Sequence, residues 1–124
     1  MVFINCLNET YILLLSSTGR GGVFFTEPGG KLECRLTVEE NAMKELFEET
    51  FATLKVQDLS KSKQVIVNNK YICFTICFRV DDLTYLKSML DANKKTLNTA
   101  NLKQLHCFTE MYGYEFLQLK LLNE

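Results

Sequence analysis

Short runs of apolar residues, separated by polar turn-forming residues, fill the first 26 positions of the chain. The runs at 2–7, 11–17 and 23–26 predict three short strands joined by turns or loops. In the third run Phe24 and Phe25 must point to opposite faces, so we expect one in the core and the other beside a pocket. The opening run is too short and too often interrupted by polar residues to cross a bilayer, so no membrane association is expected.

The hydrophobic period changes after residue 37, where the pattern predicts a helix that runs to Thr50. Thr37 and Glu40 have the spacing of a capping box at its start. At about 100° per residue, apolar and acidic residues fall on opposite sides of this helix, with Lys44 at the edge of the acidic side. The apolar side consists of Ala42, Met43, Leu46, Phe47 and Thr50, and the acidic side of Glu45, Glu48 and Glu49.

The three acids are in an unfavourable position for a purely structural helix. Carboxylates three or four residues apart repel one another by roughly 0.2–0.5 kcal/mol per pair. The dipole at the end of a helix disfavours each of them by roughly 0.3–1 kcal/mol more. A divalent cation bound by oxygen ligands would reverse both effects. The alternative is a solvated acidic surface, on which Glu40, Lys44 and Glu48 form a ladder of ion pairs.

The rest of the chain predicts further elements of both kinds. Apolar runs predict strands at 54–59, 64–67 and 71–80, with a hairpin turn at 68–70. A helix is expected over 83–94, followed by a polar loop at 96–100, a strand at 102–108 and a last helix over 109–122. This order of elements, in a chain of 124 residues without a linker, predicts a single α/β (α+β) domain covering residues 1–124.

Composition narrows the function classes. A net charge of −1 provides no basic surface for general DNA or RNA binding. The odd number of cysteines, five, and the lack of a signal peptide favour a reduced, cytoplasmic setting over a disulfide framework. With one histidine in the chain, a zinc site has little support.

The residues in front of the acidic helix add a specific signal. The lead-in Pro-Gly-Gly-Lys-Leu-Glu at 28–33, followed by the helix at fixed spacing, resembles the Nudix box. That box reads Gly, five residues, Glu, seven residues, Arg-Glu-hydrophobic-x-Glu-Glu-x-Gly-hydrophobic. We identify residues 30–52 as a divergent Nudix box, in which the direct matches are Gly30, Glu45, Leu46, Glu48 and Glu49.

The resemblance implies both a fold and an activity. The fold would be a Nudix-like α/β/α sandwich around a mixed β-sheet. The activity would be hydrolysis of a diphosphate linkage in a nucleoside diphosphate derivative, with Mg²⁺ or Mn²⁺ as cofactor. The resemblance assigns metal binding to Gly30, Glu45, Glu48 and Glu49, catalysis to Glu45, Glu48 and Lys44, and substrate contacts to Arg20, Gly29, Gly30 and Glu33.

Three positions depart from the family pattern. Leu36 replaces a glutamate and Lys44 an arginine, which suggests that an interaction supporting the carboxylates is lost. Phe51 stands where the family has a glycine at the helix end. If the backbone keeps the family's conformation, Phe51 has a strained positive φ. We expect instead that the helix runs on through Phe51 and that the ring packs beside Phe47.

Two function classes therefore stay open. The first is a metal-dependent pyrophosphohydrolase that acts on a nucleotide, a dinucleotide or a capped RNA end. The second is a catalytically weak or inactive Nudix-like domain that binds a nucleotide or a protein partner. The complete set of Glu45, Glu48 and Glu49 favours the enzyme, whereas Leu36 and Phe51 favour the binding domain. The sequence leaves open both the substrate and whether the chain forms a homodimer.

Overall fold

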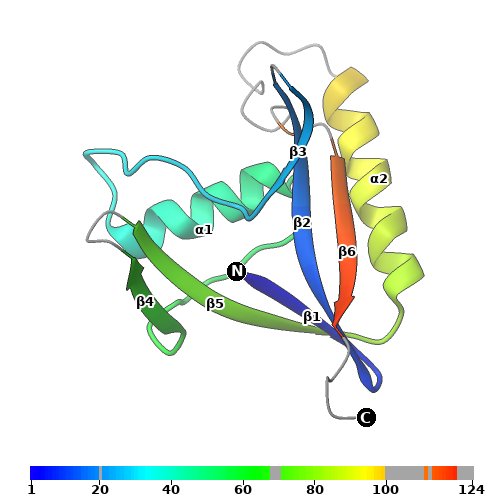
Figure 1. Ribbon diagram of the computed structural model, residues 1–124, viewed down its shortest axis with the longest axis horizontal. Coiled ribbons are helices and arrows are strands. Elements are labelled where there is room, and N and C mark those ends of the chain that lie inside the picture. Colours follow the sequence, from blue (N-terminus) through cyan, green and yellow to red (C-terminus); the bar gives the residue numbers. More distant parts are fainter. Residues whose placement is uncertain (20, 68–70, 100–110, 112, 120–124) are drawn as a thin grey trace.

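The computed structural model describes residues 1–19, 21–67, 71–99, 111 and 113–119. Within them the chain forms strands and helices in the mixed order of an α+β domain (Figure 1). In chain order these elements are β1 (Val2–Cys6), β2 (Glu9–Gly19), β3 (Gly22–Thr26), α1 (Val38–Glu49), β4 (Lys63–Val67), β5 (Tyr71–Val80), α2 (Leu83–Thr99) and β6 (Gly113–Leu119).

The strands form one mixed sheet. Its order is β3-β2-β1-β5-β4, and β6 pairs with β2 as well. The central pair, β1 and β5, is parallel, with Val2 opposite Ile76 and Cys6 opposite Val80. The other pairs are antiparallel. A mixed six-stranded sheet with two helices confirms the predicted fold class, and it is consistent with a Nudix-like α/β/α sandwich.

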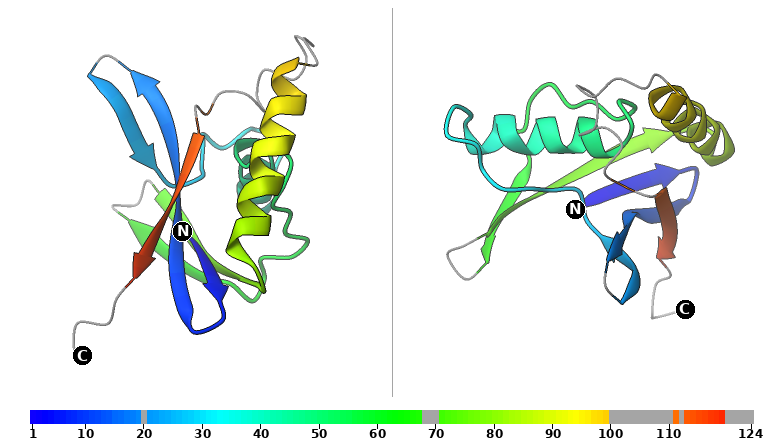
Figure 2. Two further views of the ribbon diagram at one scale, coloured as in Figure 1. Left: turned by 90° about the vertical axis from the view of Figure 1, so that its right-hand side faces the viewer. Right: turned by 90° about the horizontal axis from the view of Figure 1, so that it is seen from above.

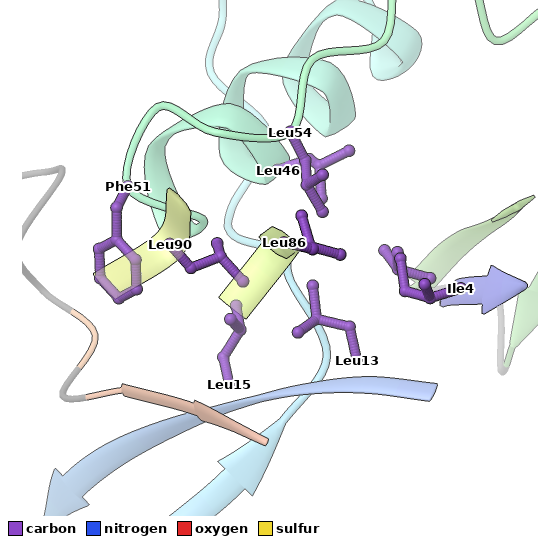
Figure 3. Close-up of a cluster of buried hydrophobic side chains, with 9 residues drawn as sticks. Ile4, Leu13, Leu15, Leu46, Phe51, Leu54, Leu86 and Leu90 are labelled. Atoms are coloured by element: carbon purple, nitrogen blue, oxygen red, sulfur yellow. The ribbon is translucent and has the colours of Figure 1, made fainter. Parts of the chain in front are cut away.

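The core lies between the sheet and the two helices, as the close-up in Figure 3 shows. Alternate residues of β1 and β2 are buried because successive side chains of a strand point to opposite faces. They meet apolar side chains from α1, α2 and the segment after α1 (Figure 3). Figure 2 shows the two helices beside the sheet from two further directions. Complete burial of one such side chain contributes about 1.5–3 kcal/mol. The buried members of this core are Val2, Ile4, Leu13, Leu15, Leu46, Phe51, Leu54, Leu86 and Leu90.

The segment 54–59 is not the strand that its apolar residues predicted. Its two leucines, Leu54 and Leu59, are buried, but their spacing of five residues does not put them on one face of a strand. The segment is tied to the end of α1, where the Leu54 amide donates to the hydroxyl of Thr50 at 3.0 Å. A local side-chain bond of this kind replaces the ladder that a strand would need.

The predicted last helix is also wrong, because Gly113–Leu119 forms β6. Its apolar residues fit the helical period, but Tyr114 and Phe116 also alternate correctly for a strand whose one face packs on the core. The register against β2 runs from Gly113 opposite Ser16 to Leu119 opposite Thr10. Partner strands of this length outweigh the weak local preference for helix.

Two smaller predictions also fail. Helix α2 extends to Thr99, which removes most of the loop expected at 96–100. Phe24 and Phe25 are both exposed, so neither enters the core. The strand predicted at 102–108 and the turn at 68–70 lie outside the described residues. Neither helix in the described part of the chain has the length and apolar character needed to cross a membrane.

Candidate functional site

Helix α1 begins at the capping box that the sequence predicted. Thr37 has extended backbone geometry, and its hydroxyl accepts a hydrogen bond from the Glu40 amide at 3.1 Å. The Glu40 carboxylate in turn accepts from the Thr37 amide at 3.0 Å. These bonds satisfy two backbone donors at the helix start, and the bond from the Thr37 backbone lowers the pKa of Glu40 below its usual value. The cap therefore fixes where the acidic residues fall along the helix.

The Pro-Gly-Gly turn packs directly against the acidic residues of α1. The Gly29 amide donates to the Glu49 carboxylate at 2.7 Å. A Cβ added to Gly30 would lie only 2.7 Å from the carboxyl carbon of Glu45, so a side chain there would displace the Glu45 carboxylate from its present position. Further along, the Glu33 amide donates to the side chain of Asn41 at 3.4 Å. The turn and the helix thus form one unit, although Gly29 and Glu49 are 20 residues apart in the sequence.

Lys44 places a positive charge among three of the carboxylates. Its Nζ lies 2.9 Å from Glu33 Oε1, 3.1 Å from Glu48 Oε1 and 4.0 Å from Glu45 Oε1. The hydrogen bond to Glu33, followed by that to Glu48, raises the pKa of Lys44 above its usual value. The expectation that the support of the carboxylates is lost with Leu36 and Lys44 is therefore wrong. Glu33, from the lead-in, supplies the carboxylate that Lys44 binds.

Glu45, Glu48 and Glu49, unlike the half-exposed Glu33, are largely removed from water. The side chains of Glu45 and Glu48 are 15% and 12% exposed, and Glu49 as a whole is 3% exposed. The solvated acidic surface considered from the sequence does not describe these residues. Only the Lys44–Glu48 pair of the expected ladder forms, because Glu40 binds Thr37 instead. Carboxylates in such a setting need positive charge or hydrogen-bond donors nearby.

Helix α1 ends at Glu49, with Thr50 as its C-cap. The Ala52 amide donates to the Phe47 carbonyl at 2.8 Å and the Phe51 amide to the Glu48 carbonyl at 3.2 Å, which are the two bonds of a Schellman motif. Phe51 occupies the position where this motif favours glycine, and its φ is +57°. The expectation that the helix runs on through Phe51 is therefore wrong. Its ring is nevertheless fully buried in the core, with Lys94 Nζ 5.7 Å from the ring centroid.

The donor chemistry of the unit fits a hard divalent cation. Carboxylate and carbonyl oxygens are the ligands that Mg²⁺ and Mn²⁺ prefer. Around Lys44 three carboxylates already converge on one positive charge. As the side chains stand, no group of three or more His, Cys, Asp or Glu residues in the described ranges is arranged to hold a metal ion. A metal would therefore require the glutamate side chains to turn from their present partners.

The structure brings most of the predicted site residues together. Gly29, Gly30, Glu33 and Lys44 join the three glutamates of α1, whereas Arg20 lies outside the described residues. Asn41, which fastens the lead-in to the helix, was missed because a single asparagine in a helix carries no sequence signal of its own.

Two surface hollows lie away from the acidic helix. One, of about 390 Å³, lies between the end of β5 and the start of α2, and the other, of about 350 Å³, lies at the β1–β2 turn. No residue of α1 lines either of them. No protein-family model matches the sequence, and no curated protein sequence matches it either.

Proposed function

We propose that this domain is a divalent-metal-dependent hydrolase of the Nudix type, which cleaves a diphosphate linkage in a nucleoside diphosphate derivative. One observation supports this most directly: the Pro-Gly-Gly turn packs on the acidic helix, with the Gly29 amide on Glu49 and with Gly30 against Glu45. A helix that carried its acids only for solubility would not need a backbone amide bound to one of them.

The proposed roles follow from where each group lies. Glu45, Glu48 and Glu49, together with the carbonyl of Gly30, would hold Mg²⁺ or Mn²⁺. The metal would supply neutralisation of phosphate oxygens and a water of lowered pKa. Lys44 orients Glu48 through its ammonium group, and Glu33 holds Lys44 from the lead-in. One carboxylate of the cluster serves as general base.

A second candidate is a Nudix-like domain that binds a nucleotide with weak or no catalysis. The position of Lys44 favours it, because the ammonium group already neutralises part of the acidic charge that would attract a metal. The two candidates differ in metal affinity, which can be measured without knowledge of the substrate.

The test is a calorimetric Mn²⁺ titration of wild type and the Glu49→Gln variant. Glutamine keeps an oxygen to accept from the Gly29 amide but removes the charge, so the fold should persist. We expect at least about tenfold weaker binding in the variant. Glu39→Gln is the matched control, since Glu39 lies in the first turn of the same helix, outside the cluster. It should bind Mn²⁺ like wild type.

Activity is tested in parallel by product analysis with Mg²⁺ and Mn²⁺ on nucleoside polyphosphates, nucleotide sugars, dinucleotides and capped RNA. Cleavage of a diphosphate linkage that is lost in Glu49→Gln would support the enzyme. Equal Mn²⁺ affinity in wild type and Glu49→Gln would place any metal site elsewhere. Nucleotide binding without Mn²⁺ binding or cleavage would favour the second candidate.

A further inference from the structure

Two adjacent phenylalanines of β3 stand largely in solvent. Phe24 is 52% exposed and Phe25 is 56% exposed, although each ring has a large apolar surface that burial would stabilise. Two described neighbours of Phe24 are small: Ser17 lies opposite it on β2, and a Cβ on Gly21 would lie 3.8 Å from the tip of its ring. This arrangement leaves much of the ring uncovered.

The sheet register separates the two rings. Residues directly opposite each other in an antiparallel pair point to the same face, and successive residues alternate. Thr26 lies opposite Leu15, so Phe24, two residues before Thr26, is on the face of Leu15. Phe25 lies opposite Ser16 and is therefore on the other face.

The face of Phe24 is also the face on which α1 ends. Leu15 belongs to the same buried cluster as Leu46 of α1 and Phe51, which directly follows the helix (Figure 3). Phe24 is one same-face position beyond the Thr26–Leu15 pair, about 7 Å further along the strand. Strand β3 then leads into the turn whose Gly29 binds Glu49. The five Cα-to-Cα steps from Phe24 to Gly29 can span at most roughly 18 Å.

We propose that Phe24 is the residue on which the substrate's base stacks, so that the substrate is a nucleoside diphosphate derivative and not a diphosphate without a base. This inference rests on the proposed function, because it takes the acidic unit as the place of the phosphates. An exposed aromatic ring on the helix side of the sheet, whose Cα lies no more than roughly 18 Å from that of Gly29, provides the flat apolar surface that every nucleobase can stack on. Phe25 offers the same aromatic ring, but on the face of the sheet opposite to that of Phe24.

The test compares the binding of AMP, GMP, CMP and UMP with that of ribose 5-phosphate, the counterpart that lacks a base. Binding is measured by calorimetry in the presence of Mn²⁺ for wild type, Phe24→Ala and Phe25→Ala. Wild type should prefer at least one nucleotide to ribose 5-phosphate. In Phe24→Ala that preference should fall about five- to tenfold, the lower end of what loss of one stacking ring costs, because the ring is half exposed. The affinity for ribose 5-phosphate should not change.

Phe25→Ala is the matched control and should keep the wild-type preference. Phe24→Tyr should keep it too, which separates stacking from damage to the fold. An unchanged preference in Phe24→Ala, an equal loss in Phe25→Ala, or a wild type without preference for any nucleotide would overturn the proposal. Cleavage assays distinguish failure of the stacking role of Phe24 from failure of the proposed hydrolase activity. Cleavage by both wild type and Phe24→Ala with equal KM would refute the role of Phe24 alone. Nucleotide preference that depends on Phe24, without any cleavage, would refute the hydrolase and keep the stacking residue.

Discussion

Phe51 combines two properties that act on stability in opposite directions. Its backbone has a φ of +57°, a conformation that favours glycine, and its side chain is fully buried in the core. Substitution by glycine would relieve the backbone and remove the ring, and substitution by alanine would remove the ring alone. The two variants together therefore separate the two effects.

The magnitudes decide the sign of each change. Removal of a buried phenylalanine side chain costs about 3–5 kcal/mol in the free energy of unfolding. A positive φ costs an L-residue about 1–2 kcal/mol, of which glycine recovers only part because it is more flexible when unfolded. Phe51→Ala should thus destabilise by about 3–5 kcal/mol, and Phe51→Gly by about 0.5–1 kcal/mol less. The free energy of unfolding of Phe51→Gly should still be well below that of wild type, because burial of the ring contributes more than the backbone strain costs.

The assay is urea unfolding at equilibrium, followed by circular dichroism, with the free energy extrapolated to water for each variant. Two alanine positions calibrate the backbone effect without a ring. Ala52 also has a φ of +57°, so Ala52→Gly should raise stability. Ala42→Gly, within α1, should lower the free energy of unfolding by roughly 0.5–1 kcal/mol.

Two results would refute this reasoning. If Phe51→Gly unfolds at a higher urea concentration than wild type, burial of the ring contributes less than the strain it imposes. If Phe51→Ala is as stable as Phe51→Gly while Ala52→Gly is destabilising, the helix does not end in the left-handed geometry described above.

Three further predictions concern the site and its supports. Gly30→Ala should weaken Mn²⁺ binding, measured by calorimetry, at least about tenfold, because its Cβ would lie 2.7 Å from the Glu45 carboxyl carbon. Gly29→Ala is the control and should bind Mn²⁺ like wild type, because no atom lies within 4 Å of a Cβ added there. Leu7→Gly should raise the free energy of unfolding by about 0.5–1 kcal/mol in urea, because Leu7 has a φ of +55° and is 84% exposed; a lower value would contradict the strain. Glu40, whose pKa is lowered on folding, should stabilise the domain above its usual pKa of 4.5 and lose that effect as pH falls through its folded value. The gap in melting temperature between wild type and Glu40→Gln should therefore be present at about pH 7 and shrink as the pH is lowered below 4.5, and a gap independent of pH would refute the charge as its cause.

The acidic helix was the most predictable part of the fold because its signals are local. The capping box, the apolar side and the spacing of the acids all depend on residues within four positions of one another, and α1 begins where they indicated. The first three strands and the β4–β5 pair were predicted for the same reason. Their turn residues and their apolar runs lie next to each other in the sequence.

The elements that failed depend on distant partners. Residues 113–119 have spacing compatible with either helix or strand, and β2, a hundred residues earlier in the chain, decides for the strand. Residues 54–59 contain enough apolar residues for a short strand, but no strand pairs with them in the described part of the chain. The end of α1 was misjudged because the rule that glycine favours positive φ is a preference. Burial of the Phe51 ring supplies enough free energy to override it.

The acidic residues of α1 have a support that differs from the pattern of the Nudix box, which residues 30–52 resemble in sequence. Relative to that pattern, Leu36 lacks a carboxylate, and Lys44 keeps the positive charge but lacks the planar guanidinium group. In the structure Glu33 lies 2.9 Å from Lys44, and Lys44 reaches Glu48 at 3.1 Å, so a lead-in carboxylate still acts on the helix glutamates through a cation. The double variant Leu36→Glu with Lys44→Arg has the residues of the Nudix box pattern at both positions. It would therefore add a second supporting carboxylate where Glu33 already provides one. If hydrolysis by the double variant is faster than wild type, Glu33 is an incomplete substitute; if it is not, the pair of Glu33 and Lys44 is already sufficient.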